Sequence, residues 1–514
     1  MRAVVLLRRT HARAIRFHWR SVARSCGAHS RHVGADQTSH YLRGSIRLIT
    51  RTDIAMSESR QSVLLFTSKL GYQTRSFEEA AKKLNVELVY VTDRCHQLDD
   101  PWEDRAIPVH FEKPAEAAQS VVEKMRRANI AGILALGDRP AHAAAFAARA
   151  LSIPFHHPAA VEACRSKLRM REVLRDAGLP VPWFRAVALE PIPEPALLGM
   201  QYPCVLKPLS LSASQGVIRV NNREEFIAAA TRIRKLLQTP EIQATREPRL
   251  NEIIAEGYLP GREVAVEALM SAGELRILAI FDKPDPLEGP YFEETIYVTP
   301  TRLGPQQITA IENSLRASAT ALGLSHGPIH AEFRIGEFLG DDAKKGASNH
   351  GDPSARQGVS TGNETVWPLE IAPRPIGGLC ARSLRFKTRN VETIGLEELL
   401  LRHALELPDS DAPREEAASG VMMIPVPQSG VFSGVSGEEE AASTPGVTQI
   451  LISARAHDYI ATWPEGASYL GFIFAGGENP ETVEAALRQA HPKLTFQITP
   501  RLEVHHPSSS VQNR

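Results

Sequence analysis

Short apolar runs alternate with segments of helical periodicity in the first part of the chain that has a regular pattern. The apolar runs are typical of buried parallel strands, and the periodic segments between them predict helices. This alternation predicts a doubly wound parallel sheet that closes near Pro158. The expected strands are Ser62–Phe66, Glu87–Thr92 and Gly132–Leu136, and the expected helices are Ser76–Leu84 and Ala115–Ala128.

From about residue 159 the pattern changes to longer helices and more closely spaced strands. The polar segment between Gly336 and Glu364 has almost no apolar residues, so we interpret it as a disordered hairpin tip between two strands. The helices expected here are Pro158–Ala177, Arg223–Leu237, Pro305–Leu322 and Gly395–Ala404. The expected strands are Cys204–Pro208, Val217–Val220, Glu252–Glu256, Arg262–Met270, Glu274–Phe281, Ile329–Ile335 and Val366–Ile371.

The last hundred residues alternate again and predict a small α+β unit without a catalytic-looking cluster. Its expected elements are the strands Val421–Val426, Gln449–Ile452, Leu470–Ala475 and Leu494–Ile498 and the helix Pro480–Ala490. We therefore expect an α/β and α+β multidomain protein. Its expected parts are an extension over 1–58, a parallel α/β domain over 59–160, a central domain over 161–411 and a C-terminal α+β domain over 412–514.

Composition narrows the class of protein. The 514 residues suggest about three domains. Lys plus Arg and Asp plus Glu both number 59, which gives no electrostatic argument for nucleic acid or an acidic membrane surface. No run of apolar residues approaches the length of a membrane span. The five cysteines are widely spaced, which argues against a disulfide framework and fits a reducing compartment, so we expect a cytoplasmic protein.

The neutral total hides a basic head. Residues 1–55 carry eleven Arg, no Lys and two acids, a net charge of +9. This composition is typical of a transit peptide or a basic tail. We favour a disordered extension or a start misplaced upstream of Met56 over a targeting signal, and the head is left out of the fold prediction.

The segment from Glu256 to Glu263 is the most informative one for chemistry. Two carboxylates seven residues apart flank a strand end and a Pro-Gly turn. An adenine ring could lie along the extended backbone at 256–259, and a carboxylate beyond the turn could accept both ribose hydroxyls. On this octapeptide alone, a hairpin with solvated charges is an equally good interpretation.

A second candidate is Lys207, at the end of an apolar strand. A buried ammonium without a partner is costly, so we expect it to meet an anion. The small residues at 210–216 directly after it offer hydroxyls and backbone amides that could fold over phosphate oxygens. An ordinary serine-rich loop is the alternative. Neither GxGxxG nor GxxxxGK[ST] occurs, which leaves no dinucleotide fingerprint and no P-loop.

A third candidate pairs two strands across the polar tip. His330, Glu332 and Arg334 share one face of the first strand, while Glu370 and Arg374 lie at the end of the second. If the strands are neighbours, Glu332 and Glu370 can face each other. Such a pair suits Mg²⁺, which takes its remaining ligands from phosphates and water. Two unrelated surface carboxylates are the alternative.

The order of these motifs, from Lys167 to Arg374, resembles the ATP-grasp superfamily. The segments PLEIAPRPIGG and GVFSGVSG…PGVTQI most resemble the L-amino acid ligase (dipeptide synthetase) branch, a relative of biotin carboxylase and D-alanine–D-alanine ligase. The resemblance spans roughly residues 60 to 500. It implies an ATP-grasp fold with an N-terminal doubly wound domain, a lid at about 165–265 and a small C-terminal α+β domain.

The resemblance also implies roles for individual residues. Lys167 and Lys207 would contact ATP phosphates, residues 256–259 would form the adenine hinge, and Glu263 would hold the ribose. Glu332 and Glu370 would bind Mg²⁺, or Mn²⁺ in its place, although Ala372 stands where many relatives have a third ligand, Asn. Arg374 would stabilise the acyl phosphate and the tetrahedral species. The ATP-binding set is Lys167, Lys207, Ser210, Ser212, Ser214, Gln215, Gly216, Glu256, Gly257, Tyr258, Leu259 and Glu263. The candidates for substrate contacts are Tyr291, Glu293, Glu294, Tyr297, His330, Gly377 and Gly378.

The implied reaction is ATP-dependent joining of a small carboxylate to an amine through an acyl phosphate, with release of ADP and phosphate. The partners would be small-molecule acids and amines, with no nucleic acid and no membrane, and relatives suggest a homodimer through the first domain. No GxSxG motif occurs, and this chemistry needs no protein nucleophile. Two alternatives stay open: a biotin-carboxylase-like enzyme that activates bicarbonate, and a non-catalytic module that binds ATP.

Overall fold

The computed structural model describes residues 61–68, 72–93, 106–192, 197–337, 360–361 and 364–500. The predictions for the basic head, for Met56 and for most of the polar tip at 337–364 lie outside the described residues.

The N-terminal sheet is parallel and has the strand order β3-β2-β1-β4. Alternate residues of β1 pack on opposite faces of this sheet. Val63 and Leu65 join the cluster that includes Phe77 of α2, whereas Leu64 and Phe66 join the cluster under α3 and α4. Because both faces are covered, the strand residues form a continuous apolar run. The elements are β1 Ser62–Thr67, α2 Tyr72–Lys83, β2 Glu87–Thr92, β3 Ala106–Pro108, α3 Pro114–Lys124, β4 Ile130–Leu136 and α4 Asp138–Leu151.

The predicted helix 158–177 is wrong as one element. It is two helices, α5 Pro158–Arg165 and α6 Lys167–Asp176, because Ser166 adopts an extended conformation between them. The Ser166 side chain accepts a hydrogen bond from the backbone N–H of Arg169 and so caps the second helix. As a result Lys167 lies at the first position of α6 rather than in the middle of a longer helix.

A four-stranded antiparallel sheet follows, in the order β5-β8-β6-β7. Phe226 and Ile233 of α8 pack against its strands and form a separate core. The elements are β5 Phe184–Ala188, β6 Cys204–Pro208, β7 Ile218–Val220, α8 Arg223–Leu237, α9 Pro240–Gln243 and β8 Glu252–Gly257. This sheet and helix correspond to the predicted lid, and we call them the lid.

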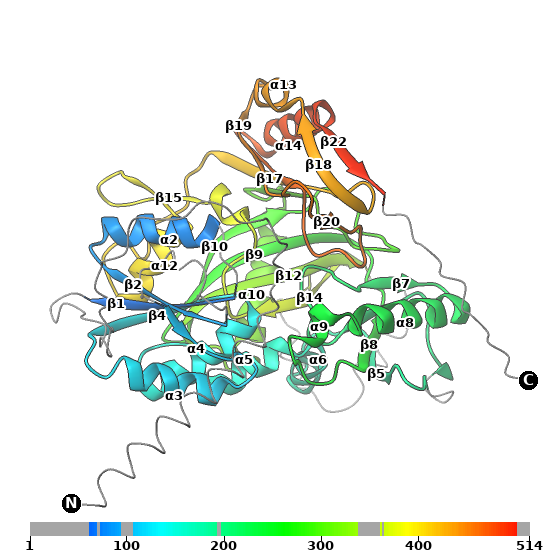
Figure 1. Ribbon diagram of the computed structural model, residues 1–514, viewed down its shortest axis with the longest axis horizontal. Helices are drawn as coiled ribbons and strands as arrows, with labels where there is room; N and C mark the ends of the chain where they lie inside the picture. The colour runs from blue at the N-terminus through cyan, green and yellow to red at the C-terminus, as the bar shows by residue number, and fades with distance from the viewer. Residues whose placement is uncertain are drawn as a thin grey trace, which may run out of the picture. The chain divides into compact units, whose positions relative to one another are not determined.

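The central sheet has nine strands in the order β13-β14-β12-β9-β10-β11-β17-β21-β19 (Figure 1). It includes strands from the predicted central domain and from the predicted C-terminal domain. The hydrogen-bonded ladder runs on from β11 to β17. The boundary predicted near residue 412 therefore falls between two strands of one sheet, and the division into domains stays a prediction.

The central elements before this boundary are β9 Arg262–Ser271, β10 Glu274–Asp282, β11 Ile296–Thr299, α10 Pro305–Leu322, β12 Gly327–Glu337, β13 Ser360–Thr361, β14 Glu364–Ala372, η2 Cys380–Ser383, β15 Arg385–Lys387, β16 Thr393–Gly395 and α12 Leu396–Ala404. The later elements are β17 Ala418–Ile424, β18 Gly430–Ser436, α13 Glu438–Ala442, β19 Val447–Ile452, β20 Tyr459–Ile460, β21 Gly471–Gly477, α14 Pro480–Ala490, η3 His491–Lys493 and β22 Thr495–Thr499. Strands β20, β18 and β22 form a separate small sheet.

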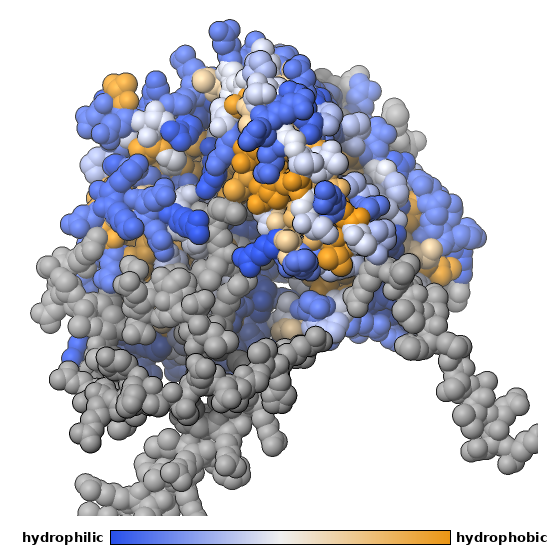
Figure 2. All heavy atoms as spheres, turned by 45° about the horizontal axis from the view of Figure 1, so that its top comes forward, coloured by the Kyte–Doolittle hydropathy of each residue, from blue (hydrophilic) through white to orange (hydrophobic). Residues whose placement is uncertain are grey.

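The surface drawn in Figure 2 is mostly polar, and its apolar side chains gather in separate clusters. In the part of the chain that the structure describes, no helix is both long and apolar enough to cross a membrane.

Candidate active site

Two facing carboxylates lie on neighbouring antiparallel strands. The register of β12 and β14 places Glu332 directly opposite Glu370, with an irregularity in the pairing immediately after Glu332. Residues paired in this way project from the same face of a sheet. The two residues predicted to bind a metal ion are therefore brought together.

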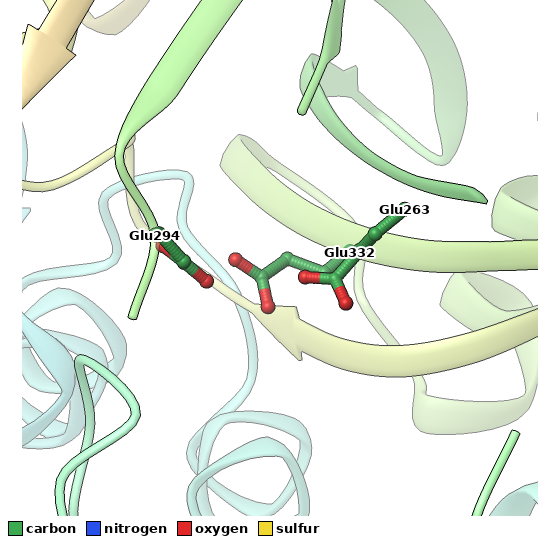
Figure 3. A group of neighbouring side chains, drawn as sticks. All are labelled: Glu263, Glu294 and Glu332. Atoms are coloured by element: carbon green, nitrogen blue, oxygen red, sulfur yellow. The ribbon is translucent and has the colours of Figure 1, made fainter. Parts of the chain in front are cut away.

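Three glutamates surround one lysine beside this pair. Lys283 follows β10, and its Nζ lies 2.8 Å from Glu263 Oε1, 2.9 Å from Glu294 Oε1 and 2.8 Å from Glu332 Oε1. Figure 3 shows the three carboxylates turned toward one another, and their ligand atoms lie within 4.8 Å of each other. One ammonium among three carboxylates leaves an excess of negative charge if all of them are ionised.

The crowding of charge shifts the pKa values of this cluster. Burial and the neighbouring Glu332 raise the pKa of Glu294 to about 7. Burial alone would lower the pKa of Lys283, but the three carboxylates raise it well above its usual value, so the ammonium stays charged. Tyr297 donates a hydrogen bond to Glu294 Oε2 at 2.6 Å. Residues 291–297 contain four of the predicted substrate contacts, and two of these, Glu294 and Tyr297, belong to the carboxylate cluster.

His330 belongs to a buried pair that supports the next loop. Its Nδ1 lies 2.5 Å from Glu267 Oε1, and the other oxygen of Glu267 accepts a hydrogen bond from the backbone N–H of Ile376 at 3.0 Å. Burial opposes the charge on His330, but Glu267 raises its pKa to about 9. The pair is thus ionic at neutral pH and fixes the loop that carries Gly377 and Gly378.

Arg374 links the site to the N-terminal sheet. Its Nε donates to Asp138 Oδ1 at 2.8 Å, and its Nη2 lies 3.6 Å from Glu370 Oε1. Burial works against the charge, but Asp138 raises the pKa of Arg374 further above its usual value. Asp138 begins α4 directly after the parallel strand β4, where such sheets commonly bind ligands.

The predicted Lys207 finds its anion within the protein. Lys207 forms an ion pair with Glu256, which also pairs with Arg171 Nε at 2.9 Å. Arg171 donates in addition to the carbonyls of Pro368 and Leu369, both at 3.0 Å, and so ties the lid to β14. Burial would raise the pKa of Glu256, but the two cations hold it at about 2. The Glu256 side chain is therefore a structural anchor beneath the predicted adenine hinge.

The hinge itself is shaped by Arg334. This side chain donates to the Leu259 carbonyl at 2.6 Å and to Glu263 Oε2 at 3.0 Å. The N–H groups of Gly257 and Tyr258 already donate to the carbonyls of Trp183 and Pro203. Both oxygens of Glu263, the predicted ribose ligand, are thus engaged, by Lys283 and Arg334.

The turn after the hinge requires a glycine. Gly261 has a φ of +111°, and a Cβ there would lie 2.2 Å from the carbonyl oxygen of Ile335. The close approach of this turn to β12 sets Glu263 beside Arg334.

Lys167 meets the small-residue loop, which we call the phosphate loop (residues 210–216). Its Nζ donates to the Leu211 carbonyl at 2.6 Å. Together with Asp138, Ser210, Ser212 and Glu370 it lines a small pocket between the lid and β14. The pocket thus brings the first predicted lysine and the second predicted metal ligand to one place. Ser214, Gln215 and Gly216 do not line it.

Glu293 and Tyr291 lie apart from the carboxylate cluster. The Glu293 carboxylate accepts a hydrogen bond from the backbone of Val426, and its Oε1 is buried without a further partner among the described residues. Tyr291 forms an isolated bridge to Ile218 of the lid and is partly exposed. Neither residue contacts Lys283 in the structure.

Four charged residues at this site received no role from the sequence. They are Asp138 and the buried residues Arg171, Lys283 and Arg334. Lys283 and Arg171 lie outside the three candidate segments of the sequence analysis. Their roles become visible only from the side chains that they contact in the structure. Arg334 was placed on the strand face of Glu332 by the two-residue period of β12, but the period does not show that it contacts Glu263 and Leu259.

The donor set of Glu332 and Glu370 fits a divalent cation that prefers oxygen. Glu332 meets both Lys283 and His330 through the same oxygen, Oε1. Glu370 is partly exposed beside the pocket. Two carboxylates with few other protein ligands suit Mg²⁺, and Ala372 adds no third oxygen ligand from its side chain.

Comparison with known proteins identifies two domains of the chain and the fold that they share with solved structures. The family described as "ATP-grasp domain" matches residues 200–339, and the family described as "L-amino acid ligase C-terminal domain 2" matches residues 422–499. The crystal structure of an L-amino acid ligase from Bacillus licheniformis superimposes with a TM-score of 0.68 at 25% identity, covering 86% of this chain and 100% of that one. Biotin carboxylase from Campylobacter jejuni, at 14% identity and a TM-score of 0.54, shares the fold.

Two curated relatives match at similar identity. The "ATP-grasp enzyme fsqD" of Aspergillus fumigatus is 25% identical over 66% of this chain and 60% of its own length. The alanine–anticapsin ligase of Bacillus subtilis is 27% identical over 34% of this chain and 39% of its own length. The chain thus spans about 60% of the length of the first of these relatives and less of the second.

The fold is that of ATP-grasp proteins, which confirms the predicted fold class. The C-terminal match is more particular. The chain carries an ATP-grasp domain and an L-amino acid ligase C-terminal domain, as the resemblance in its sequence predicted.

Proposed function

We propose that this protein joins two amino acids through a peptide bond at the expense of ATP. The carboxylate of the first amino acid attacks the γ-phosphorus of ATP, which gives an acyl phosphate and ADP. The amine of the second attacks the acyl carbon and releases phosphate. The observation that carries the proposal is the convergence of Lys167, Glu332, Glu370 and Arg374 around one face of β12 and β14.

The nucleotide would lie between the lid and the central sheet. Lys167 and the phosphate loop would meet the phosphates, and the backbone at 256–259 would meet the adenine. Lys207 forms an ion pair with Glu256 on the neighbouring strand β8. We therefore assign it a phosphate contact only through the small part of its side chain that stays exposed. A ribose bound at Glu263 would compete with Lys283 and Arg334 for its oxygens.

Glu332 and Glu370 are the residues that would hold Mg²⁺. A bound Mg²⁺ neutralises charge on the phosphates while a second anion approaches them. Arg374, held in place by Asp138, would supply a fixed positive charge to the acyl phosphate and to the tetrahedral species that follows. The ionic pair of His330 and Glu267 would keep the 376–378 backbone in position beside the substrates.

Glu294 is the proposed contact of the substrate ammonium. It has one oxygen on Lys283 and the other on Tyr297, and a pKa of about 7 suits a group that exchanges a proton near neutral pH. Glu293, which is turned toward Val426, is a weaker candidate for the same task. Which amino acids are joined depends on the shape and the polar groups of the substrate pocket.

The direct test is an ADP-release screen with the purified full chain. Single amino acids, pairs of amino acids, and bicarbonate with free biotin are compared, and any peptide product is identified by mass spectrometry. We expect ADP release and a dipeptide only when suitable pairs are present, and none with Glu370→Ala. ADP release that requires bicarbonate instead would favour the carboxylase alternative. Tight ATP binding without turnover across the screen would favour a binding module.

A further inference from the structure

The C-terminal part of the chain contacts the phosphate loop directly. We call residues 461–467 the C-terminal loop. Trp463 Nε1 donates to the Ala213 carbonyl at 3.1 Å, and the Gly216 N–H donates to the Pro464 carbonyl at 2.8 Å. Gln215 Nε2 donates to the Glu465 carbonyl, also at 2.8 Å. Three hydrogen bonds therefore join two loops about 250 residues apart in sequence.

The lid helix is tied to the same loop. Arg232 of α8 forms a two-pronged ion pair with Glu465, from Nε to Oε1 at 2.5 Å and from Nη2 to Oε2 at 2.7 Å. The guanidinium also lies 5.0 Å from the centre of the Tyr291 ring. The C-terminal loop is thereby joined to the lid segment at two places, the phosphate loop and α8.

The phosphate loop needs such support because its backbone is strained. Ala213 and Ser214 have φ values of 56° and 54°, in the left-handed region. Residues other than glycine rarely adopt this conformation, because the side chain then crowds the backbone. The three hydrogen bonds from the C-terminal loop fall on residues 213, 215 and 216, which include and flank the strained pair.

The same loop continues toward the predicted substrate contacts. Trp463 is buried and its ring lies 4.9 Å from that of Tyr469. Tyr469 lies 6.4 Å from Phe472, centre to centre, and a Cβ on Gly378 would meet Phe472 at 3.6 Å. A row of aromatic rings therefore connects the phosphate loop to the glycine pair beside Arg374.

We propose that Trp463 and Glu465 are positioning residues of the ligase reaction, because they hold the phosphate loop in the conformation that covers the ATP phosphates. The proposal rests on the proposed function for its catalytic consequence. Since the acyl phosphate is sensitive to water, a loop that is held closed favours attack by the amine over hydrolysis. The C-terminal domain is then part of the catalytic cleft in addition to its place in the central sheet.

The first test measures the loop without any catalysis. Backbone hydrogen exchange of the 210–217 segment is followed in the full-length protein by mass spectrometry. Trp463→Phe keeps an aromatic ring of smaller size and removes the N–H, and Glu465→Gln weakens the ion pair to Arg232. We expect faster exchange in this segment for both variants, with unchanged exchange in the parallel sheet. Gln449→Ala is the matched control, because it removes a C-terminal contact, to Arg382, that does not involve the phosphate loop.

The second test measures the reaction. Losing one hydrogen bond of about 1 kcal/mol should raise the KM for ATP about fivefold in Trp463→Phe. We also expect more ADP released per peptide bond formed, because water gains access. Arg232→Glu and Glu465→Gln should both raise the KM for ATP, because each breaks the same ion pair. The double variant Arg232→Glu with Glu465→Arg exchanges the two charges and should recover the wild-type KM.

Unchanged hydrogen exchange at 210–217 in both variants would overturn the proposal. Variants with a wild-type KM for ATP and a wild-type ratio of ADP released to peptide bonds formed would overturn it as well. Failure of the exchanged pair to recover either readout would also count against it. These outcomes are separate from failure of the proposed function, which would appear as wild-type protein that joins no amino acids while its phosphate loop still depends on Trp463 in the exchange experiment.

Discussion

The ammonium of Lys283 lies 2.8 Å from Glu332 and reaches it from the end of β10, across the neighbouring strand β9. It also contacts Glu263 on β9 and Glu294 in the following loop. One lysine thus holds together residues to which we assign ribose, metal and substrate contacts. At the centre of the proposed active site, the charges of Lys283 and the three glutamates compensate one another, so that removing one of them leaves the others unpaired.

Replacing Lys283 with Met should therefore damage both folding and activity. Removing one partner of a buried ionic group typically costs roughly 3–5 kcal/mol, because the remaining charges are left uncompensated. We expect a lower midpoint of thermal unfolding and a loss of ADP release on the order of 100-fold. The double variant Lys283→Met with Glu294→Gln should regain stability without activity. Normal turnover in Lys283→Met would contradict the assignment.

Glu370→Ala should abolish turnover while nucleotide binding remains measurable, because the proposed metal ligand serves phosphoryl transfer more than adenine recognition. ADP release and calorimetric binding of ATP with Mg²⁺ test the two effects separately. Glu364→Ala is a suitable control, since Glu364 lies at the other end of the same strand and pairs with Gln307. Wild-type ADP release in Glu370→Ala would show that the metal assignment is wrong.

Lys207→Ala should raise the dissociation constant for ATP. Part of this effect comes from Glu256, which keeps only Arg171 as a cationic partner when Lys207 is removed. Lys207→Arg preserves the ion pair and should retain stability, so that any remaining loss of affinity reports on contact with the nucleotide. Equilibrium binding of a fluorescent ATP analogue provides the measurement. Unchanged affinity in Lys207→Ala would exclude its role.

Acid should destabilise the protein through His156. This buried side chain accepts a hydrogen bond from the Ser325 N–H at 3.2 Å, and burial lowers its pKa to about 4 from 6.5. Because the unfolded chain binds the proton more readily, the stabilising contribution is complete above pH 6.5 and is lost as the pH falls toward 4. Between pH 7 and pH 4.5, the free energy of unfolding measured in urea should fall less steeply in His156→Gln than in the wild-type protein. Equal slopes in the two proteins would contradict this account.

The fold was largely predictable because its elements follow hydrophobic periodicity. The helices α8, α10 and α14 match their predicted ranges, as does β6. Two of the differences have a physical reason. Strand β11 has four residues and is buried within the central sheet, so it shows no alternation, and the break at Ser166 depends on one capping hydrogen bond. Helix α4 and strand β18 were also not predicted.

The candidate site was predictable only in part. The facing of Glu332 and Glu370 followed from strand order and period, whereas the partners of Lys207 and Glu263 did not. Lys283 and Arg171 act through contacts between segments far apart in sequence, and no local spacing encodes such contacts. The same is true of the C-terminal loop, which the sequence placed in a unit without apparent chemistry.

The pairing of β11 with β17 limits how this protein can be shortened or fused to others. Ending the chain before Ala418 would leave one edge of Ile296–Thr299 without β17, while the other edge keeps β10, next to the loop that carries Glu294. An exposed edge of this kind invites pairing with other chains. Shortened forms intended as isolated nucleotide-binding units should therefore aggregate, and swaps of C-terminal regions between homologues need to keep the residues of β17 that complete the sheet.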